Sequence, residues 1–301
     1  MTHIAAHAAP QGIGRALAIG LRPRQWVKNV LVGAAPLAAG RHDGTVVAGT
    51  ALAFVLFCAA ASSVYLVNDV LDAEADRAHP HKRTRPVASG ALPVRVALTV
   101  SALLAVVSLA VPLLVDRPRL ALTLAVYLGL SHAYNVGLKH QRVVDMSIVS
   151  GGFVLRAIAG GVASDLPLSR WFLIVASFGS LFIVAGKRYA ELVVMGDDAH
   201  TTRRSLAGYS ASYLRFVWSI AAAVTISAYC LWAFEVGDRT GALLPWGPLS
   251  VAPFVVGLLR FALDVDSGAA GAPEEVALRD HVLLCLGAIW LLTFALGAFH
   301  V

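Results

Sequence analysis

The chain has 301 residues, of which 58% are hydrophobic and only 14% charged, with a formal net charge of +6 and a mean hydropathy of +0.72. Soluble domains carry about 25% charged residues, so this composition excludes a soluble globular protein. The apolar residues are spread over the whole length, which also excludes a soluble domain with one membrane anchor. Cys58, Cys230 and Cys285 each lie in an apolar run and form neither a disulfide framework nor a metal-ligand spacing.

Nine segments are predicted to cross a membrane. A bilayer core needs about 20 apolar residues in a helix. The runs without a charged residue are 44–68, 96–115, 120–138, 171–186, 216–234, 240–259 and 281–301. Two further runs are imperfect, because 29–40 is short and 146–164 contains Arg156. We therefore expect an all-α membrane protein of nine transmembrane helices, with residues 1–301 forming one membrane-embedded domain and 1–21 a polar N-terminal tail.

The basic residues predict the orientation of this bundle. With the N-terminus in the cytoplasm, 18 of the 24 Lys and Arg residues fall in cytoplasmic segments and 5 in outside segments, while Arg156 lies within a span. Cytoplasmic loops of membrane proteins carry such an excess. The pattern therefore indicates a multi-pass protein of the plasma (inner) membrane whose N-terminus is cytoplasmic.

Acidic residues end the second predicted helix. Asp69, Asp72 and Asp76 follow Asn68 at positions i, i+3 and i+7, which places them on one face of a continuous helix. Three like charges repel one another, and Mg²⁺ removes the conflict because it takes oxygen ligands from carboxylates and substrate phosphates. The alternative is a solvated acidic helix end. A helix C-terminus disfavours carboxylates unless a cation compensates them, so the metal interpretation is preferred.

A basic loop follows at once and contains Arg77, Lys82 and Arg83. Cations for phosphate oxygens beside acids for Mg²⁺ suit a diphosphate ligand. The alternative is a positive-inside loop without a ligand. No further ligands are spaced to complete a transition-metal site with His79 and His81, which are interpreted as loop residues.

Other polar clusters are predicted on the same membrane side. Arg24 and Lys28 open the first helix at positions i and i+4, on one face, and suit a lipid phosphate. Two more clusters follow the fourth and sixth helices and consist of Tyr134, Asn135, Lys139, Arg142, Lys187, Arg188 and Tyr189. Such clusters at one face fit an enzyme that joins a soluble phosphorylated substrate to a membrane lipid.

Arg156 is predicted near the middle of a span. An arginine there is costly and usually faces an internal polar cavity. Asp145 lies about 16 Å away along the same helix, so the two cannot pair and Arg156 needs a partner from another helix.

The pattern Asn68-Asp69-x-x-Asp72-x-x-x-Asp76 at the end of the second of nine helices resembles the UbiA superfamily of intramembrane prenyltransferases. The resemblance covers almost the whole chain. It implies a helical bundle around a central cavity, with Mg²⁺–diphosphate bound by aspartate motifs on cytosolic loops.

Four stretches are similar to one branch of that superfamily, the decaprenyl-phosphate phosphoribosyltransferases; they are 21–29, 76–83, 186–191 and 212–218. The branch transfers 5-phosphoribosyl from phosphoribosyl diphosphate (PRPP) to polyprenyl phosphate for cell-wall arabinan synthesis. Prenyltransferases generally carry a second aspartate-rich motif after the fourth helix. Here Asp145 is the only acid in that region and cations replace the others, which suits an anionic acceptor.

The resemblance implies a role for each cluster. Asp69, Asp72 and Asp76 would hold Mg²⁺, and Asn68 would orient the diphosphate. The residues expected to bind substrates are Lys82, Arg83, Lys187 and Arg188 for the donor phosphates, Arg24 and Lys28 for the lipid phosphate, and Arg77, Tyr134, Asn135, Lys139, Arg142, Arg156 and Tyr189 around the cavity. No general base is required, because the lipid phosphate is already ionised at neutral pH.

The nearest alternative is a prenyltransferase that joins a prenyl diphosphate to an aromatic or other small acceptor. A transporter is disfavoured because the acids gather at one membrane face and only Arg156 lies deep. The D-G-x-x-A-R motif of alcohol phosphatidyltransferases is absent, since Asp43-Gly44 continues differently. No nucleic-acid partner is expected. Gly151-Gly152 and Gly160-Gly161 permit close helix contacts within one chain or in a homo-oligomer, so the oligomeric state stays open.

Overall fold

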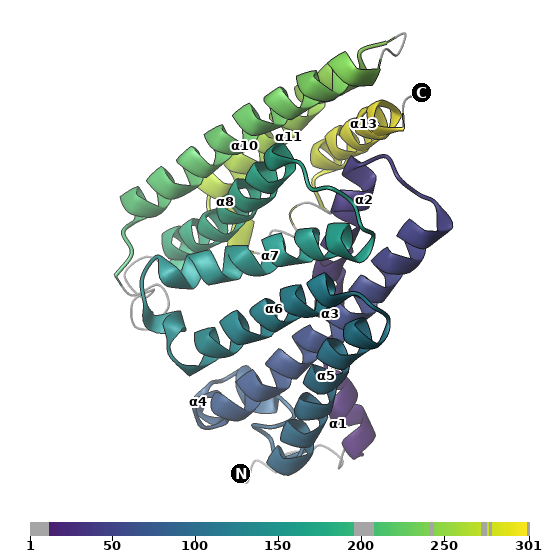
Figure 1. The fold of residues 1–301 in the computed structure, drawn as a ribbon. Coiled ribbons are helices and arrows are strands. Elements are labelled where there is room, and N and C mark those ends of the chain that lie inside the picture. Colours follow the sequence, from purple (N-terminus) through teal and green to yellow (C-terminus); the bar gives the residue numbers. More distant parts are fainter. Residues whose placement is uncertain (1–11, 196–207, 241–243, 272–275, 277–278, 300–301) are drawn as a thin grey trace. The chain divides into compact units, whose positions relative to one another are not determined.

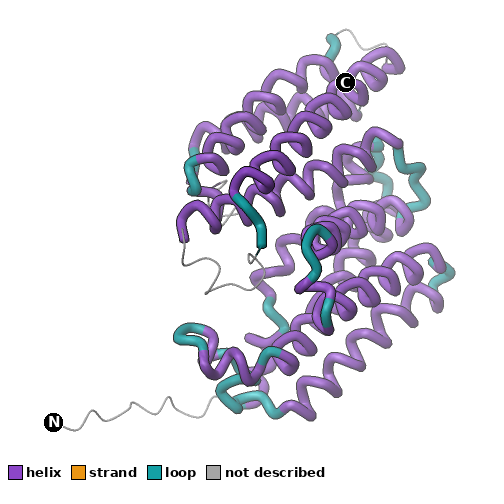
Figure 2. Tube along the Cα trace, turned by 90° about the vertical axis from the view of Figure 1, so that its left-hand side faces the viewer, coloured by secondary structure: helices purple, strands orange, loops and turns teal. Residues whose placement is uncertain are grey.

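The computed structural model describes residues 12–195, 208–240, 244–271, 276 and 279–299, with the backbone alone described for 236–240. Throughout these residues the regular elements are helices, without a strand (Figures 1 and 2). They are α1 (Ile13–Gly20), η1 (Pro23–Gly33), α2 (Ala34–Ala38), α3 (Gly44–Leu71), α4 (Ala73–Ala78), η2 (Lys82–Thr84), α5 (Val94–Leu114), α6 (Pro118–Val136), η3 (Leu138–His140), α7 (Val144–Ala163), α8 (Arg170–Met195), α10 (Ala211–Thr240), α11 (Trp246–Asp266), η5 (Ala269–Gly271) and α13 (His281–Ala298).

Seven described helices are long and apolar enough to cross a membrane, namely α3, α5, α7, α8, α10, α11 and α13. Each matches a predicted span, although α11 begins at Trp246 rather than at residue 240, directly after Pro245. Proline suits the start of a helix, where its missing N–H costs no intrahelical bond. Large apolar side chains such as Leu103 and Val106, 60% and 62% exposed, lie on the outside of α5. The chain is a multi-pass membrane protein.

The segment 29–40 is not the single short α-helix that its composition predicts. The 3₁₀ helix η1 ends at Gly33, and α2 covers five residues. Pro36 has no N–H to donate to the carbonyl of Val32, which removes one α-helical bond at this point. The same carbonyl lies against α7, because a Cβ added to Gly160 would be 1.7 Å from the Val32 oxygen.

The predicted polar tail 1–21 is also partly wrong. Residues 1–11 lie outside the described part, but Ile13–Gly20 fold as α1. Ala16 and Gly20, one helical turn apart, are buried. Their small side chains allow α1 to approach α3 closely, since a Cβ on Gly20 would lie 3.1 Å from Cδ2 of Leu66.

The chain forms two compact units, the first made up of Met1–Val30 and Leu52–Val136. Its core includes Ala16 of α1, Leu66 of α3 and Leu92 before α5. Ser101 Oγ donates to the carbonyl of Ser63 at 2.9 Å and fixes α5 against α3. This packing holds the C-terminal end of α3 against the loop that follows α4.

The second unit consists of Leu31–Ala51 and Gly137–Val301. Its core contains Met146 of α7, Phe182 of α8, Leu214 of α10 and Val265 of α11. α8 and α10 pack side by side along much of their length (Figure 1). This core carries the N-terminal end of α7 and the C-terminal half of α8, where Asp145 and Arg188 lie.

Candidate functional site

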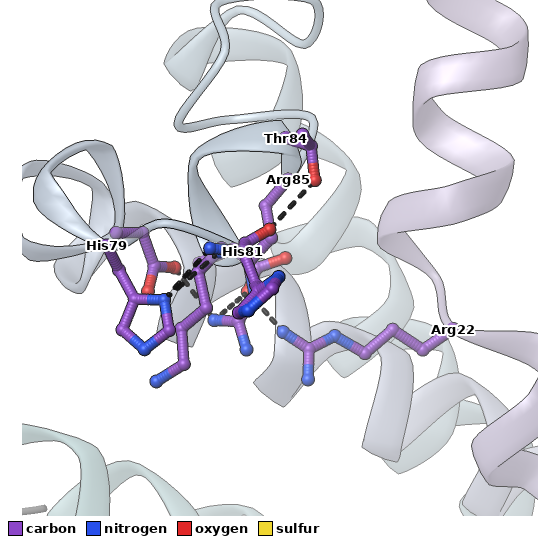
Figure 3. Close-up of polar contacts among 8 residues, drawn as sticks. Arg22, His79, His81, Thr84 and Arg85 are labelled. Atoms are coloured by element: carbon purple, nitrogen blue, oxygen red, sulfur yellow. Dashed lines mark hydrogen bonds and ion pairs between the residues drawn. The ribbon is translucent and has the colours of Figure 1, made fainter. Parts of the chain in front are cut away.

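Two aspartates and two arginines of the first unit meet near the end of α3. We call Arg22, Asp69, Asp76 and Arg85 the acidic cluster (Figure 3). Arg85 Nη1 donates to Asp76 Oδ2 at 2.7 Å and to Asp69 Oδ1 at 3.4 Å. Arg22 Nη2 also donates to Asp69 Oδ1. Asp69 and Asp76 are only 2% and 3% exposed, and buried carboxylates require such charged partners.

Asp72 stands at a break between the other two aspartates. α3 ends at Leu71 and α4 begins at Ala73, while Asp72 has φ −91° and ψ 0°. Backbone bonds continue across the break, from Asp72 N–H to the Asn68 carbonyl at 2.9 Å and from Asp76 N–H to the Asp72 carbonyl at 2.8 Å. The helix is therefore interrupted at Asp72 rather than continuous as predicted, while Asp69 and Asp76 still contact the same nitrogen of Arg85. Asp72 is half-buried at this junction.

Asp69 and Asp76 fit a Mg²⁺–diphosphate complex. One guanidinium nitrogen of Arg85 bonds to both carboxylates, so their oxygens converge on one cationic position. In the described part of the chain no three His, Cys, Asp or Glu side chains are grouped to hold a metal ion. Mg²⁺ is commonly held by one or two carboxylates, with substrate phosphates completing its coordination. This donor set therefore suits a metal that arrives with its phosphate ligand.

The basic loop is held by its own hydrogen bonds. Arg77 Nε donates to the carbonyl of Ala88 at 3.0 Å. His79 Nδ1 accepts the backbone N–H groups of His81 and Lys82 at 3.2 and 3.3 Å (Figure 3), as expected of a loop residue. The side chains of Lys82 and Arg83 are exposed. Arg77 thus anchors the loop, and Lys82 and Arg83 are accessible to a soluble substrate.

The segment before α3 carries the predicted lipid-phosphate residues. η1 is a 3₁₀ helix with three residues per turn, so positions four apart point about 120° apart. The prediction that Arg24 and Lys28 share a face is therefore wrong; Arg24 is exposed and Lys28 half-buried. Trp26 Nε1 donates to Ser62 Oγ at 3.1 Å and fixes η1 to α3. Arg22 adopts φ +54°, a left-handed conformation that is unfavourable for a residue before proline.

The end of α6 carries Tyr134 and Asn135. Tyr134 is half-buried, while Asn135 is buried. The side-chain nitrogen of Asn135 has no hydrogen-bond partner among the described residues. An unsatisfied buried donor is costly, and a substrate oxygen would satisfy it.

The second unit contains a buried cluster of Asp145, Arg188 and Tyr209, which we call the Asp145 cluster. Arg188 Nη1 donates to Asp145 Oδ2. Tyr209 Oη donates to Asp145 Oδ1 at 2.7 Å, as does the backbone N–H of Met146 at 2.7 Å. Burial raises the pKa of Tyr209 to about 12, so its hydroxyl stays a donor at neutral pH. Arg188, predicted to bind donor phosphates, is thus paired with a carboxylate of its own chain.

A strained turn precedes Asp145. Val143 has φ +68° and ψ −49°, and Val144 N–H donates to the Arg142 carbonyl at 2.8 Å, which together define a γ-turn with positive φ. Tyr209 Oη accepts the Val143 N–H at 2.5 Å and holds this turn. Gly208 has φ +91°, and a Cβ there would lie 2.3 Å from the guanidinium of Arg142. The absence of a side chain at Gly208 therefore leaves the space that the guanidinium of the exposed Arg142 occupies.

The remaining predicted residues lie in or near α7 and α8. Tyr189 Oη donates to Asp266 at 3.3 Å and accepts from Arg215, so this side chain links α8, α10 and α11. Lys139 and Lys187 are half-buried. Arg156 is buried, and its Nη1 donates to the Gly152 carbonyl at 2.7 Å within its own helix.

Sequence reasoning missed Arg22, Arg85 and Tyr209. The available signal was the need of three acids at a helix end for a cation. The sequence-based prediction gives this compensating charge to a metal ion alone, whereas Arg22 and Arg85 supply part of it in the structure. Tyr209 left no comparable signal, because its partner Asp145 is 64 residues away.

Comparisons with known proteins show the family and the fold of the chain. The model of the UbiA prenyltransferase family matches residues 29–278. The chain is 52% identical over 278 residues to a decaprenyl-phosphate phosphoribosyltransferase of Mycobacterium tuberculosis, covering 91% of each chain. It is 49% identical over 307 residues to the protein of the same description from Mycolicibacterium smegmatis, covering 96% of each.

A solved structure shows the same fold. A UbiA homologue from Archaeoglobus fulgidus, bound to DMAPP and Mg²⁺, aligns with a TM-score of 0.69 and 15% identity over 95% of this chain and 99% of that one. The family match spans most of the sequence, and the fold match spans nearly all of it. The chain therefore belongs to the UbiA prenyltransferase family.

Proposed function

We propose that this protein transfers a 5-phosphoribosyl group from PRPP to decaprenyl phosphate and releases diphosphate. The identity of about half of all residues to two decaprenyl-phosphate phosphoribosyltransferases, over more than nine-tenths of each chain, carries this assignment. The acidic cluster supports it, because two buried carboxylates converge on one cationic position in the manner a metal–diphosphate complex requires.

The reaction is a displacement at the anomeric carbon of the donor. A phosphate oxygen of the lipid forms a bond to C1 of the ribose while the bond from C1 to the diphosphate oxygen breaks. Negative charge grows on the leaving diphosphate, so catalysis consists mainly of positioning and electrostatic stabilisation. Because the attacking phosphate is already ionised, the site needs no general base.

Each residue of the first unit has a place in this mechanism. Asp69 and Asp76 would hold Mg²⁺, with Asp72 and Asn68 beside them, and the bound metal would neutralise charge on the leaving group. The exposed Lys82 and Arg83 bind donor phosphate oxygens. The exposed Arg24 binds the phosphate of the lipid, whereas Lys28 points to another side of η1 and is not assigned to the same phosphate. The unpartnered amide of Asn135 donates to a substrate oxygen.

The polar residues of the second unit are assigned separately. Lys139, Arg142 and Lys187 are proposed as phosphate ligands. Arg188 is proposed to position the start of α7 through Asp145 rather than to contact the donor, because its charge is already paired and buried. Tyr189 links α8 to α10 and α11, and Arg156 stays a proposed lining residue.

We also propose that the chain spans the membrane nine times as a single domain, with its N-terminus and active site on the cytoplasmic side. The seven long apolar helices, α6 and the segment of η1 and α2 make up these spans. Single cysteines introduced near Ala78 and Gln141 should react with a membrane-impermeant reagent from the cytoplasmic side, and one at Gly44 from outside. Labelling of Ala78 and Gln141 from opposite sides would contradict this topology.

The choice of donor tests the reaction itself. Purified protein is supplied with Mg²⁺, decaprenyl phosphate and either PRPP or geranyl diphosphate, and diphosphate release is measured. Diphosphate release is expected with PRPP and not with geranyl diphosphate. Release from the prenyl diphosphate, with PRPP ignored, would replace this proposal by prenyl transfer.

A further inference from the structure

We propose that Arg85 fills the metal position of the acidic cluster until the donor arrives, and that donor binding moves its guanidinium from the two aspartates to phosphate oxygens. This inference rests on the Mg²⁺–diphosphate site of the proposed function. It goes further by making metal and donor bind as a linked pair, with Arg85 as the linking residue.

The geometry singles out Arg85 within the acidic cluster. Its Nη1 contacts Asp76 Oδ2 at 2.7 Å and Asp69 Oδ1 at 3.4 Å, so it lies where a cation shared by both carboxylates would lie. Arg22 contacts Asp69 and leaves that carboxylate compensated when Arg85 departs. The Arg85 side chain is 28% exposed, whereas those of Asp69 and Asp76 are 2% and 5% exposed. The guanidinium therefore reaches buried acids from a side that solvent and substrate can enter.

The backbone around Arg85 allows the side chain to move alone. Arg85 N–H donates to the Lys82 carbonyl at 2.9 Å, and the Arg85 carbonyl accepts from Ser89 N–H at 2.9 Å. Pro86, Val87 and Ala88 are buried directly after it, and Arg77 holds the Ala88 carbonyl. Because the backbone is held, the proposed movement of the guanidinium is confined to side-chain torsions of Arg85.

Competition between Arg85 and a metal ion has a measurable consequence. A divalent cation that binds without donor must displace the charged hydrogen bonds of Arg85. Its apparent affinity is therefore the intrinsic affinity multiplied by the fraction of molecules in which the metal position is open. A diphosphate offers the planar guanidinium two oxygens for a bidentate pair, which offsets that loss. Metal and donor should therefore strengthen each other's binding by the same factor.

The test measures Mn²⁺ binding, as a stand-in for Mg²⁺, by electron paramagnetic resonance on the full-length protein in detergent. Wild type should bind Mn²⁺ weakly alone and much more tightly with PRPP. R85Q should bind Mn²⁺ alone at least about tenfold more tightly than wild type, the scale of one charged hydrogen bond. PRPP should then improve its Mn²⁺ affinity far less. R95Q, which removes an exposed arginine of the same unit, should behave as wild type.

The outcomes separate this inference from the function on which it rests. Unchanged or weaker Mn²⁺ binding by folded R85Q, while wild type still binds Mn²⁺ with PRPP, overturns the role of Arg85 and leaves the metal site standing. Absence of Mn²⁺ binding by wild type even with PRPP overturns both. Thermal unfolding shows whether R85Q is folded. If it is not, R85K keeps the charge but loses the planar fork, and it should raise Mn²⁺ affinity several-fold; no rise in folded R85K overturns the proposal.

Discussion

Replacing Arg188 with glutamine tests whether this arginine serves the fold or the donor. Its side chain is 10% exposed and that of Asp145 is 2% exposed, so solvent weakens the pair little. Removing one partner of a buried ion pair costs about 3–5 kcal/mol, because the other charge is left uncompensated. In R188Q, Asp145 keeps its hydrogen bonds from Tyr209 and from the Met146 N–H. The expected loss of unfolding free energy is therefore near the lower end of that range, about 3 kcal/mol.

Two further variants complete a double-mutant cycle for this ion pair. D145N should destabilise by a similar amount because it leaves a buried guanidinium without its carboxylate. The double variant D145N/R188Q removes both charges and should cost about 2–3 kcal/mol less than the two single variants together. Unfolding free energies in detergent micelles give the three values. Additive effects would refute the pairing. Normal stability of R188Q with a raised KM for PRPP would show instead that Arg188 is a donor ligand.

Further predictions concern both clusters. D69N removes a hard anionic ligand at constant shape, so turnover should fall by at least about 100-fold while the protein stays folded; near-normal turnover at saturating Mg²⁺ would contradict the metal assignment. G208A places a Cβ 2.3 Å from the Arg142 guanidinium and should raise the KM for PRPP, whereas G90A, with φ +81° but open space around its Cβ, should cost stability alone. The stability contributed by Tyr209 should be complete below pH 10, its ordinary pKa, and be lost as the pH rises to about 12; alkaline unfolding of Y209F should lack this loss, and identical profiles would contradict it.

Much of the fold follows from the sequence, because a bilayer requires long apolar helices and the charges mark their ends. Local exceptions were harder to predict. The break at Asp72 leaves the helical hydrogen bonds intact, and no proline or glycine in the sequence marks its position. The 3₁₀ conformation of η1 changes which of its residues share a face, although the apolar pattern of the segment stays the same.

The site was predictable to the level of residue types. The acids and nearby cations pointed to a metal and phosphates, but their pairing depends on packing between distant segments. Arg22 reaches Asp69 across 47 positions, and Arg188 reaches Asp145 across 43. Once such a pair forms, a charge that composition alone would assign to a substrate is neutralised inside the protein. The reassignment of Arg188 and the role of Arg85 both come from this effect.

The fate of labelled phosphate in the donor tests phosphoribosyl transfer most directly. PRPP labelled either in its 5-phosphate or in its diphosphate is mixed with purified protein, Mg²⁺ and decaprenyl phosphate, and the lipid and aqueous phases are separated. Phosphoribosyl transfer should carry the 5-phosphate label into the lipid phase and leave the diphosphate label in water, with free diphosphate formed in an equal amount. Diphosphate label in the lipid, or no transfer of the 5-phosphate label, would contradict it.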